Sequence, residues 1–528
     1  MPEIGERNGA QLAIATLAGM GVELCLTNPG TSELHLVDAL AHTPQIKTVL
    51  GLFEGVVTGA ADGYARMAGK PAMTLLHLGP GLANGLANLH NARRARTPLI
   101  NVVGQHALDH LAYDAPLTSD VAKMAATVSA RVESIDGGEE IAAACQKAWQ
   151  TATSHPGGVA TLIFPADIAW SPAPEQYPGK APVALGGKKT ASDEAIGSAV
   201  EVLRSGEPAL LLVGGSALGE AGIVAAGRIR AASGAGLATP TFNGRLERGA
   251  GRVALQKIPY FGDAVRSLLA GYKHLILVEA TPPVSFFGYP GSSGWLTPKD
   301  CRIHMLASEN EDGTGALESL AEALSAPQLP EEVQERNKPD LKSGPLSPEA
   351  IGAALAHYLP EGAIVSDEAI TAGLAVTPMT AGARPHTWLD LTGGSIGQGI
   401  PLATGAALAS GDRKVVALAG DGSALYTIQA LWTQARENLD VTTIIFANRN
   451  YAILKFEQAG LFGPAGVVDG GVAAEIDNPE IGFVDLARGF GVEAARAETA
   501  EEFTDLFASS MKRRGPFLIE ASYSVAGL

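Results

Sequence analysis

Short apolar runs alternate with Ala- and Leu-rich stretches along most of the chain. The runs have the length of single strands and stand at residues 47–52, 72–78, 98–104, 209–215, 274–280, 363–367, 414–420 and 441–447. The stretches between them carry apolar residues at helical spacing, which is typical of parallel sheets covered by helices. We therefore expect an α/β chain of doubly wound parallel sheets, which bind ligands at the carboxyl ends of their strands.

Two segments, 171–189 and 326–345, lack any apolar period and are rich in proline, glycine and charged residues. This composition is typical of exposed linkers between domains. The chain is therefore predicted to have three domains, at residues 1–170, 190–325 and 346–528. The central one has a Rossmann-like pattern of strand, glycine turn and helix.

Composition narrows the functional classes. The 528 residues include 38 Lys and Arg and 55 Asp and Glu, a net charge of −17, whereas a nucleic-acid partner needs a basic face. The three cysteines form no Cys-x-x-Cys pair, which favours a reducing compartment over a disulfide framework. Because there is no signal-peptide pattern and no apolar run of membrane-spanning length, we expect a cytoplasmic protein that binds neither membranes nor nucleic acids.

The sharpest local feature is Gly-Asp-Gly-Ser at 420–423, between a buried strand and a helix. Glycines let the backbone approach a phosphate, and a helix N-terminus favours an anion. Because a carboxylate there repels a phosphate unless a cation lies between them, Asp421 indicates a bridging Mg²⁺. Asn448 follows Asp421 by 27 residues, at the end of the next predicted strand, so both should lie at one edge of the sheet. The alternative is a plain strand–turn–helix unit in which Asp421 caps the helix.

This pair of motifs resembles the signature of thiamine diphosphate (ThDP) enzymes, in which Gly-Asp-Gly is followed by two asparagines. The chain has Ala447 at the first asparagine and keeps the second as Asn448. The resemblance implies that Asp421, Asn448 and the backbone carbonyl of Asn450 bind Mg²⁺. It places a large aliphatic residue, Ile396, where the family bends its cofactor. The implied cofactor contacts in this third of the chain are Ile370, Thr371, Gly394, Ile396, Gly420, Gly422, Ser423, Asn450 and Tyr451.

Glu54 follows a predicted strand and opens a helix in which Gly55, Gly59 and Gly63 recur every four residues. Such a bare stripe permits close helix packing, which suits a subunit interface. The stretch Glu-x(7)-Ala-Asp-Gly-Tyr-Ala-Arg resembles the family segment whose glutamate hydrogen-bonds the pyrimidine ring of ThDP, which implies that Glu54 is catalytic. The alternative is a glutamate stabilised by the helix dipole. Because this glutamate and the metal site come from different subunits in the family, the resemblance implies a homodimer or homotetramer.

Segments 27–34 and 75–105 look most like benzoylformate decarboxylase and, more broadly, the acetolactate synthases. The resemblance gives His77 the role of an active-site histidine that orients substrate and moves protons, and Thr31 that of a catalytic hydroxyl. A purely structural histidine is the alternative. A second active-site histidine of the decarboxylase is replaced at or near Phe287. Because that change removes a proton donor, we expect carboligation to exceed aldehyde release.

We therefore expect a ThDP- and Mg²⁺-dependent enzyme that decarboxylates a small 2-oxo acid and ligates the product to an aldehyde or oxo acid acceptor. The alternatives are a simple decarboxylase, a flavin-dependent 2-oxo acid oxidase and a non-catalytic ThDP-binding subunit. FAD is the less favoured cofactor, since the glycines at 214, 215 and 219 do not fit Gly-x-Gly-x-x-Gly. Leu454, Leu461 and Phe462 are candidates for the pocket wall and equally for ordinary packing.

Overall fold

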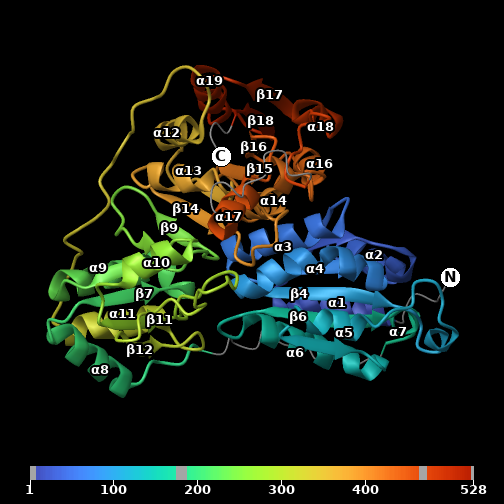
Figure 1. Cartoon of the computed structure of the whole chain (residues 1–528). Coiled ribbons are helices and arrows are strands. Elements are labelled where there is room, and N and C mark those ends of the chain that lie inside the picture. Colours follow the sequence, from blue (N-terminus) through green and yellow to red (C-terminus); the bar gives the residue numbers. More distant parts are fainter. Residues whose placement is uncertain (1–6, 174–186, 463–472, 525–528) are drawn as a thin grey trace.

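The computed structural model describes residues 7–173, 187–462 and 473–524 and confirms the expected α/β fold (Figure 1). Three sheets follow one another along the chain, blue to cyan, green to yellow and orange to red in Figure 1. Most of the first predicted linker, 174–186, lies outside the described residues. The division into domains at the predicted boundaries stays a prediction.

The first sheet is parallel throughout, in the order β2-β1-β3-β4-β6-β5. Strands β3, β4 and β6 are buried along their whole length, because helices cover both faces of the sheet. The strands are β1 (Leu24–Asn28), β2 (Lys47–Leu50), β3 (Ala72–Leu76), β4 (Leu99–Gln105), β5 (Arg131–Ser134) and β6 (Val159–Pro165). The helical segments are α1 (Gly9–Met20), η1 (Thr31–Glu33), α2 (Leu34–Ala41), α3 (Glu54–Ala68), α4 (Leu78–Ala95), η2 (His110–Tyr113), α5 (Val121–Ala126), η3 (Gly138–Glu140), α6 (Ile141–Thr153) and α7 (Ala166–Trp170).

The second sheet is also parallel, in the order β10-β8-β7-β11-β12. Its strands are β7 (Ala209–Val213), β8 (Gly236–Thr239), β10 (Gln256–Lys257), β11 (His274–Val278) and β12 (Arg302–Ala307). Its helical segments are α8 (Asp193–Arg204), η4 (Gly215–Leu218), α9 (Glu220–Ser233), α10 (Gly262–Leu269) and α11 (Gly313–Ala323).

The third sheet has the order β17-β18-β16-β15-β13-β14-β9, and β9 (Leu246–Arg248) is its antiparallel edge. The other strands are β13 (Ile364–Glu368), β14 (His386–Asp390), β15 (Val415–Gly420), β16 (Val441–Ala447), β17 (Glu493–Ala497) and β18 (Phe517–Ser522). The helices are α12 (Pro348–Tyr358), α13 (Gly373–Met379), α14 (Gly399–Ser410), α15 (Asp421–Ala424), α16 (Ala430–Arg436), α17 (Ala452–Phe462), α18 (Phe483–Gly489) and α19 (Ala500–Ser510).

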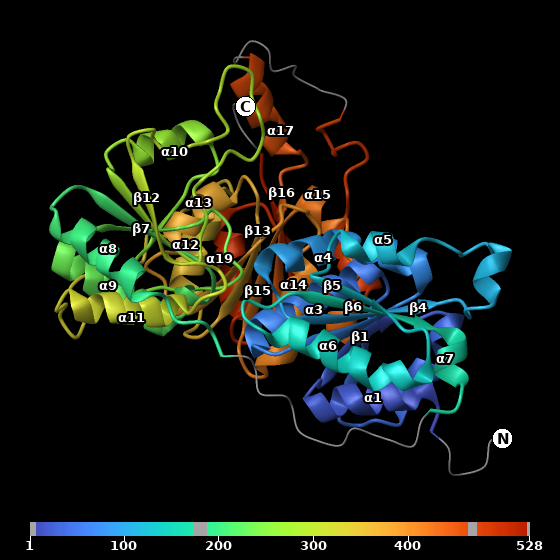
Figure 2. The ribbon, with the colours of Figure 1, turned by 90° about the horizontal axis from the view of Figure 1, so that it is seen from below.

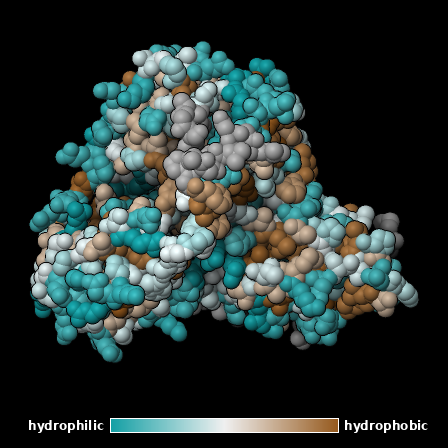
Figure 3. All heavy atoms as spheres, in the orientation of Figure 1, coloured by the Kyte–Doolittle hydropathy of each residue, from teal (hydrophilic) through white to brown (hydrophobic). Residues whose placement is uncertain are grey.

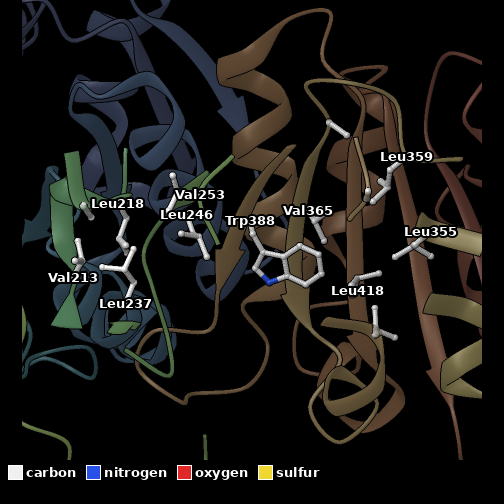
Figure 4. Close-up of a cluster of buried hydrophobic side chains, with 14 of the residues drawn as sticks. Val213, Leu218, Leu237, Leu246, Val253, Leu355, Leu359, Val365, Trp388 and Leu418 are labelled. Atoms are coloured by element: carbon white, nitrogen blue, oxygen red, sulfur yellow. The ribbon is translucent and has the colours of Figure 1, made fainter. Parts of the chain in front are cut away.

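The antiparallel strand β9 joins the second and third sheets into one body. It comes from the middle of the chain, yet Leu246 pairs with Trp388 of β14. A continuous buried cluster runs from Val213 on β7 through Leu246 and Trp388 to Leu418 on β15 (Figure 4). These two sheets therefore share a hydrophobic core.

Helices α3 and α14 pack backbone to backbone through glycines. A Cβ atom at Gly63 would overlap the Leu402 carbonyl oxygen, and one at Gly405 would overlap the Ala60 carbonyl oxygen. The prediction that the glycine stripe of α3 serves a subunit interface is therefore wrong for Gly59 and Gly63, because both face α14 of the same chain. This close approach ties the helix that begins with Glu54 to the third sheet.

Asp62 and Arg66, the charged pair of the Ala-Asp-Gly-Tyr-Ala-Arg motif, form a buried clamp between parts of the chain. The Arg66 guanidinium donates to both oxygens of Asp62, at 2.8 and 2.6 Å. It also donates to the carbonyl oxygens of Gly244 at 3.3 Å and Asp390 at 3.0 Å. In the structure these two motif residues therefore hold the first sheet against the other two.

Candidate active site

His77 lies where β3 ends and α4 begins, against the turn that follows β1. Its Nδ1 is 2.8 Å from Oε2 of Glu33, which also accepts the Gly30 N–H at 2.9 Å. A side chain at position 30 would overlap the His77 imidazole ring, so only glycine fits there. Thr31, next in the chain, is exposed as the first residue of η1. The structure therefore brings the two predicted residues, Thr31 and His77, to one strand-end surface.

Glu33, which binds both His77 and the Gly30 N–H, is fully buried. Burial raises the pKa of its carboxyl group, while the hydrogen bond with His77 opposes that rise. Among the described residues its second oxygen, Oε1, has no hydrogen-bond partner. Glu33 therefore sets the orientation of the His77 ring, a positioning role that sequence reasoning missed.

Glu54 begins α3 and is buried there. Its Oε2 accepts a hydrogen bond from Nδ2 of Asn84 on α4, at 3.0 Å, and Gly81 lies beside Oε1. The bare surface of Gly81 leaves room at this carboxyl group. Like Glu33, Asn84 positions a predicted catalytic residue without having been predicted itself, although it lies within segment 75–105.

Asp421 begins α15 directly after β15, as the sequence predicts. Oδ1 accepts the Gly422 N–H at 2.8 Å, and Oδ2 accepts the Arg449 N–H at 2.5 Å. Burial raises the pKa of Asp421 to about 6, because its charge is largely removed from water. A cation beside the carboxylate would offset this cost, so the residue suits a metal ligand.

The loop after β16 supplies the other predicted metal ligands. Asn448 Oδ1 accepts the Asn450 N–H at 2.9 Å, and the buried Oδ1 of Asn450 has no partner among the described residues. Tyr451 follows, with its ring where a Cβ of Gly422 would stand. Across the described residues, no three His, Cys, Asp or Glu side chains group as metal ligands. A metal here would therefore use amide and carbonyl oxygens beside one carboxylate, a donor set that fits Mg²⁺.

A cavity of about 670 Å³ lies between the second and third sheets. Four predicted cofactor contacts line it: Ile370, Thr371, Gly394 and Ile396. Two other residues singled out from the sequence, Phe287 and Leu454, also line it. Leu461 and Phe462 do not belong to the wall and are exposed at the end of α17.

Ile370 lies between this cavity and the Gly-Asp-Gly-Ser turn at 420–423. Its Cγ1 lies 3.9 Å from the position that a Cβ of Gly420 would occupy. Its φ of 52° is in the left-handed region, which is unusual for a β-branched residue. Such strain persists only where surrounding contacts impose it, and it concentrates at functional sites.

Glu368 anchors the loop that carries Gly394 and Ile396. Its carboxylate accepts the N–H groups of residues 397, 398 and 399, at 2.6, 3.2 and 2.7 Å. On the other side of the loop, the Asn91 side chain accepts the Ser395 N–H at 3.2 Å and donates to the Ser395 carbonyl oxygen at 2.8 Å. No local motif marked Glu368, since its partners lie about thirty residues away.

The two halves of the predicted site do not line one common cavity within the described residues. Within the described residues, the cavity wall contains nothing from the first sheet, which carries Thr31, Glu54 and His77. On the side where α3 and α4 lie in Figure 1, Figure 3 shows brown, apolar patches among white and teal ones. Leu52, just before α3, and Leu34, the first residue of α2, are exposed.

The glycine turn of the central sheet does not fit FAD. Glu279, at the end of β11, accepts the Ser216 N–H at 2.6 Å and the Gly313 N–H at 2.9 Å. In a dinucleotide site, N–H groups at the starts of such helical segments receive the phosphates. Here a carboxylate of the same charge already occupies that position, so a diphosphate would be repelled.

The chain matches two known sequence families: "Thiamine pyrophosphate enzyme, N-terminal TPP binding domain" over residues 7–125, and the corresponding C-terminal TPP binding domain over residues 373–521. A Mycobacterium tuberculosis protein provisionally named acetolactate synthase large subunit is 47% identical over 517 residues, or 97% of this chain and 98% of the relative. The benzoylformate decarboxylase of Pseudomonas aeruginosa is 28% identical, covering 95% and 96%.

Solved structures agree with the fold. The ThDP-dependent 4-hydroxybenzoylformate decarboxylase of Rhodococcus jostii has a TM-score of 0.86 at 23% identity, covering 98% of this chain and 99% of that one. In the part of the chain that the structure describes, no helix is both long and apolar enough for a membrane span.

Proposed function

The chain belongs to the thiamine pyrophosphate enzymes, and we propose that it removes CO₂ from a 2-oxo acid and ligates the remaining acyl unit to a carbonyl acceptor, using ThDP and Mg²⁺. The observation that carries this proposal is the shared location of Ile370, Gly394 and Ile396 in one cavity wall, beside the loop of Asp421. When bound, ThDP supplies an electron sink for the bond that CO₂ leaves.

Mg²⁺ would be held by a carboxylate oxygen of Asp421, the amide oxygen of Asn448 and the carbonyl oxygen of Asn450. Hard oxygen ligands of this kind suit Mg²⁺, whose remaining positions are filled by phosphate oxygens and water. Gly420, Gly422 and Ser423 would lie against the diphosphate, where small residues leave the backbone accessible. The raised pKa of Asp421 supports this assignment, because burial outweighs the charge of Arg449, whose guanidinium pairs with Glu480.

A homodimer would complete each site. Glu54 of one copy would reach the pyrimidine end of the cofactor held by the other, where its carboxyl group exchanges a proton with the ring nitrogen. His77 would then face the substrate, with Nδ1 held by Glu33 and Nε2 able to accept or donate a proton. Thr31 would contribute a hydroxyl group on the same side.

Phe287 favours ligation over release in this proposal. It lines the cavity and supplies no proton donor, so protonation after loss of CO₂ would be slower and ligation to a second carbonyl group would be favoured. Phe287→His should therefore raise the ratio of aldehyde to ligation product. Phe287→Leu is the matched control, because it alters the wall without adding a donor. Equal product ratios in both variants would contradict the role of Phe287.

The proposed function is tested by a carbon-13 NMR time course with protein stripped of metal and cofactor. ThDP and Mg²⁺ are added, then labelled pyruvate or benzoylformate, with and without benzaldehyde. Ligation products that require both additions would support the proposal, and Asp421→Ala should abolish them. Aldehyde and CO₂ alone would instead identify a simple decarboxylase. Cofactor binding without turnover of any 2-oxo acid would refute the enzymatic proposal.

A further inference from the structure

Helix α17 begins directly after the loop 448–451 and forms part of the cavity wall. Ile453, Leu454 and Glu457 line it, and their spacing puts them on one face of the helix. In Figure 2, α17 stands at the upper edge of the molecule, close to a yellow-green loop of the central sheet. Tyr289 of that loop donates a hydrogen bond to Oε2 of Glu457, at 2.6 Å.

The other carboxylate oxygen of Glu457 lacks a partner. Oε1 is buried and no described donor stands in good hydrogen-bond geometry to it, although the Tyr260 hydroxyl lies beside the carboxylate. The nearby cations are engaged elsewhere: Lys257 binds Asp390 at 2.7 Å, and Arg248 donates to the Thr377 carbonyl at 2.6 Å. A buried carboxylate oxygen without a donor is costly, so the site favours a ligand that brings one.

The remaining carboxylates of the cavity wall already have partners. Glu368 accepts three backbone N–H groups, and Asp390 binds Lys257. Asp367 accepts from the Trp388 indole at 3.2 Å, and Glu247 pairs with Arg252 at 2.9 Å. Within the described part of this wall, the unpartnered carboxylate oxygen therefore belongs to Glu457.

Aromatic rings surround this end of the cavity. Tyr260 and Phe286 are stacked with centroids 4.8 Å apart, and Phe242 meets Phe286 edge to face at 5.4 Å. Burial raises the pKa of Tyr260, and both the negative charge of Glu457 and a hydrogen bond with its carboxylate add to the rise. Charges interact strongly in such apolar surroundings, and ring faces attract cations.

We propose that Glu457 recognises a cationic group, a guanidinium or ammonium, at the far end of the side chain of the 2-oxo acid. The proposal rests on the proposed function, because it assigns a substrate class to the same cavity. Glu457 is four residues beyond Ile453, about 6 Å along the helix at 1.5 Å per residue. Because α17 begins directly after the loop 448–451, Glu457 lies farther from that loop than Ile453 does, so the cation belongs at the far end of the substrate side chain.

The test compares two substrates of equal length on holoenzyme: 5-guanidino-2-oxopentanoate, whose side chain ends in a cation, and 2-oxooctanoate, whose side chain is uncharged. We expect kcat/KM to favour the cationic acid at least about tenfold, because hydrogen bonds between charged groups are worth about 10- to 150-fold. Glu457→Gln should remove most of that preference and change turnover of 2-oxooctanoate less than about threefold. Glu318→Gln, an exposed glutamate on α11, is the matched control and should leave the preference unchanged.

Binding to cofactor-free protein separates this inference from the proposed function. Calorimetric titration with 5-guanidinopentanoate and octanoate, which lack the oxo group, should show tighter binding of the cationic acid, lost in Glu457→Gln. Equal binding of the two acids, or a preference that survives the substitution, would overturn the inference while leaving 2-oxo acid turnover intact. Absence of turnover with this binding preference intact would instead overturn the proposed function. Equal preference for a terminal hydroxyl would also overturn the assignment of a cation.

Discussion

Replacing Glu368 by glutamine tests how the cofactor-facing loop of the cavity is held. Glu368 is 2% exposed and accepts the N–H groups of residues 397–399, directly after Ile396. Burial raises its pKa to about 7 from the ordinary 4.5, although the three donors oppose the rise. Desolvation of the charged form is therefore the larger effect at this carboxyl group.

The magnitude follows from that difference in pKa. The gap between about 7 and 4.5 corresponds to about 3 kcal/mol at about 1.4 kcal/mol for a tenfold change. Because the folded protein binds this proton more tightly than the unfolded chain, the contribution to stability is fully present below about pH 4.5. It is lost as the pH rises through about 7.

Glutamine cannot titrate, so the stability cost of Glu368→Gln should depend on pH. The cost should be larger at about pH 5 than at about pH 8, by about 2.5 kcal/mol. Urea unfolding of both proteins measures the cost, with Glu318→Gln as the control for a substituted exposed glutamate. Infrared difference spectra, wild type minus Glu368→Gln, should show a protonated carboxyl band that disappears near pH 7.

A cost that stays constant or grows with pH would refute this reasoning. So would the absence of a protonated carboxyl band at about pH 6. Either result would mean that the three N–H donors outweigh desolvation. The loop would then be anchored by a permanent anion.

Three further predictions follow from the packing, the His77 site and the central sheet. Gly405→Ala should lower the free energy of unfolding by more than about 2 kcal/mol, because its Cβ would overlap the Ala60 carbonyl oxygen. Gly197→Ala, where nothing lies near the added Cβ on α8, should be neutral or stabilising by up to about 1 kcal/mol. Equal unfolding midpoints of the two variants would contradict the α3–α14 contact. Glu33→Gln should reduce kcat by about ten- to a hundredfold with cofactor affinity unchanged, because His77 loses its carboxylate partner, and an unchanged kcat would remove Glu33 from the mechanism. The purified protein should carry no flavin absorbance, even after incubation with FAD, because a carboxylate occupies the phosphate-binding turn; a yellow protein would show that this turn opens.

Local patterns were sufficient for the elements and for the motif residues. The alternation of apolar runs and helical stretches predicts parallel α/β sheets, because strand and helix periodicity are written in neighbouring residues. Asp421, Asn448 and Glu54 stand at strand ends, so their sheet edges follow from the order of elements alone. Ile396 and Phe287 line the cavity, and both were singled out by their alignment with the family. The apolar periodicity alone would not have distinguished either from a packing residue.

Contacts between distant segments required the tertiary structure. Glu33 meets His77 across 44 residues, and Tyr289 meets Glu457 across 168. The glycines of α3 predicted close packing but did not indicate that α14 is the partner helix. The sequence by itself determined which residues stand at strand ends, because that depends on short-range propensity and burial pattern. Only the folded chain decided which of them share a site, because that depends on how sheets far apart in sequence pack together.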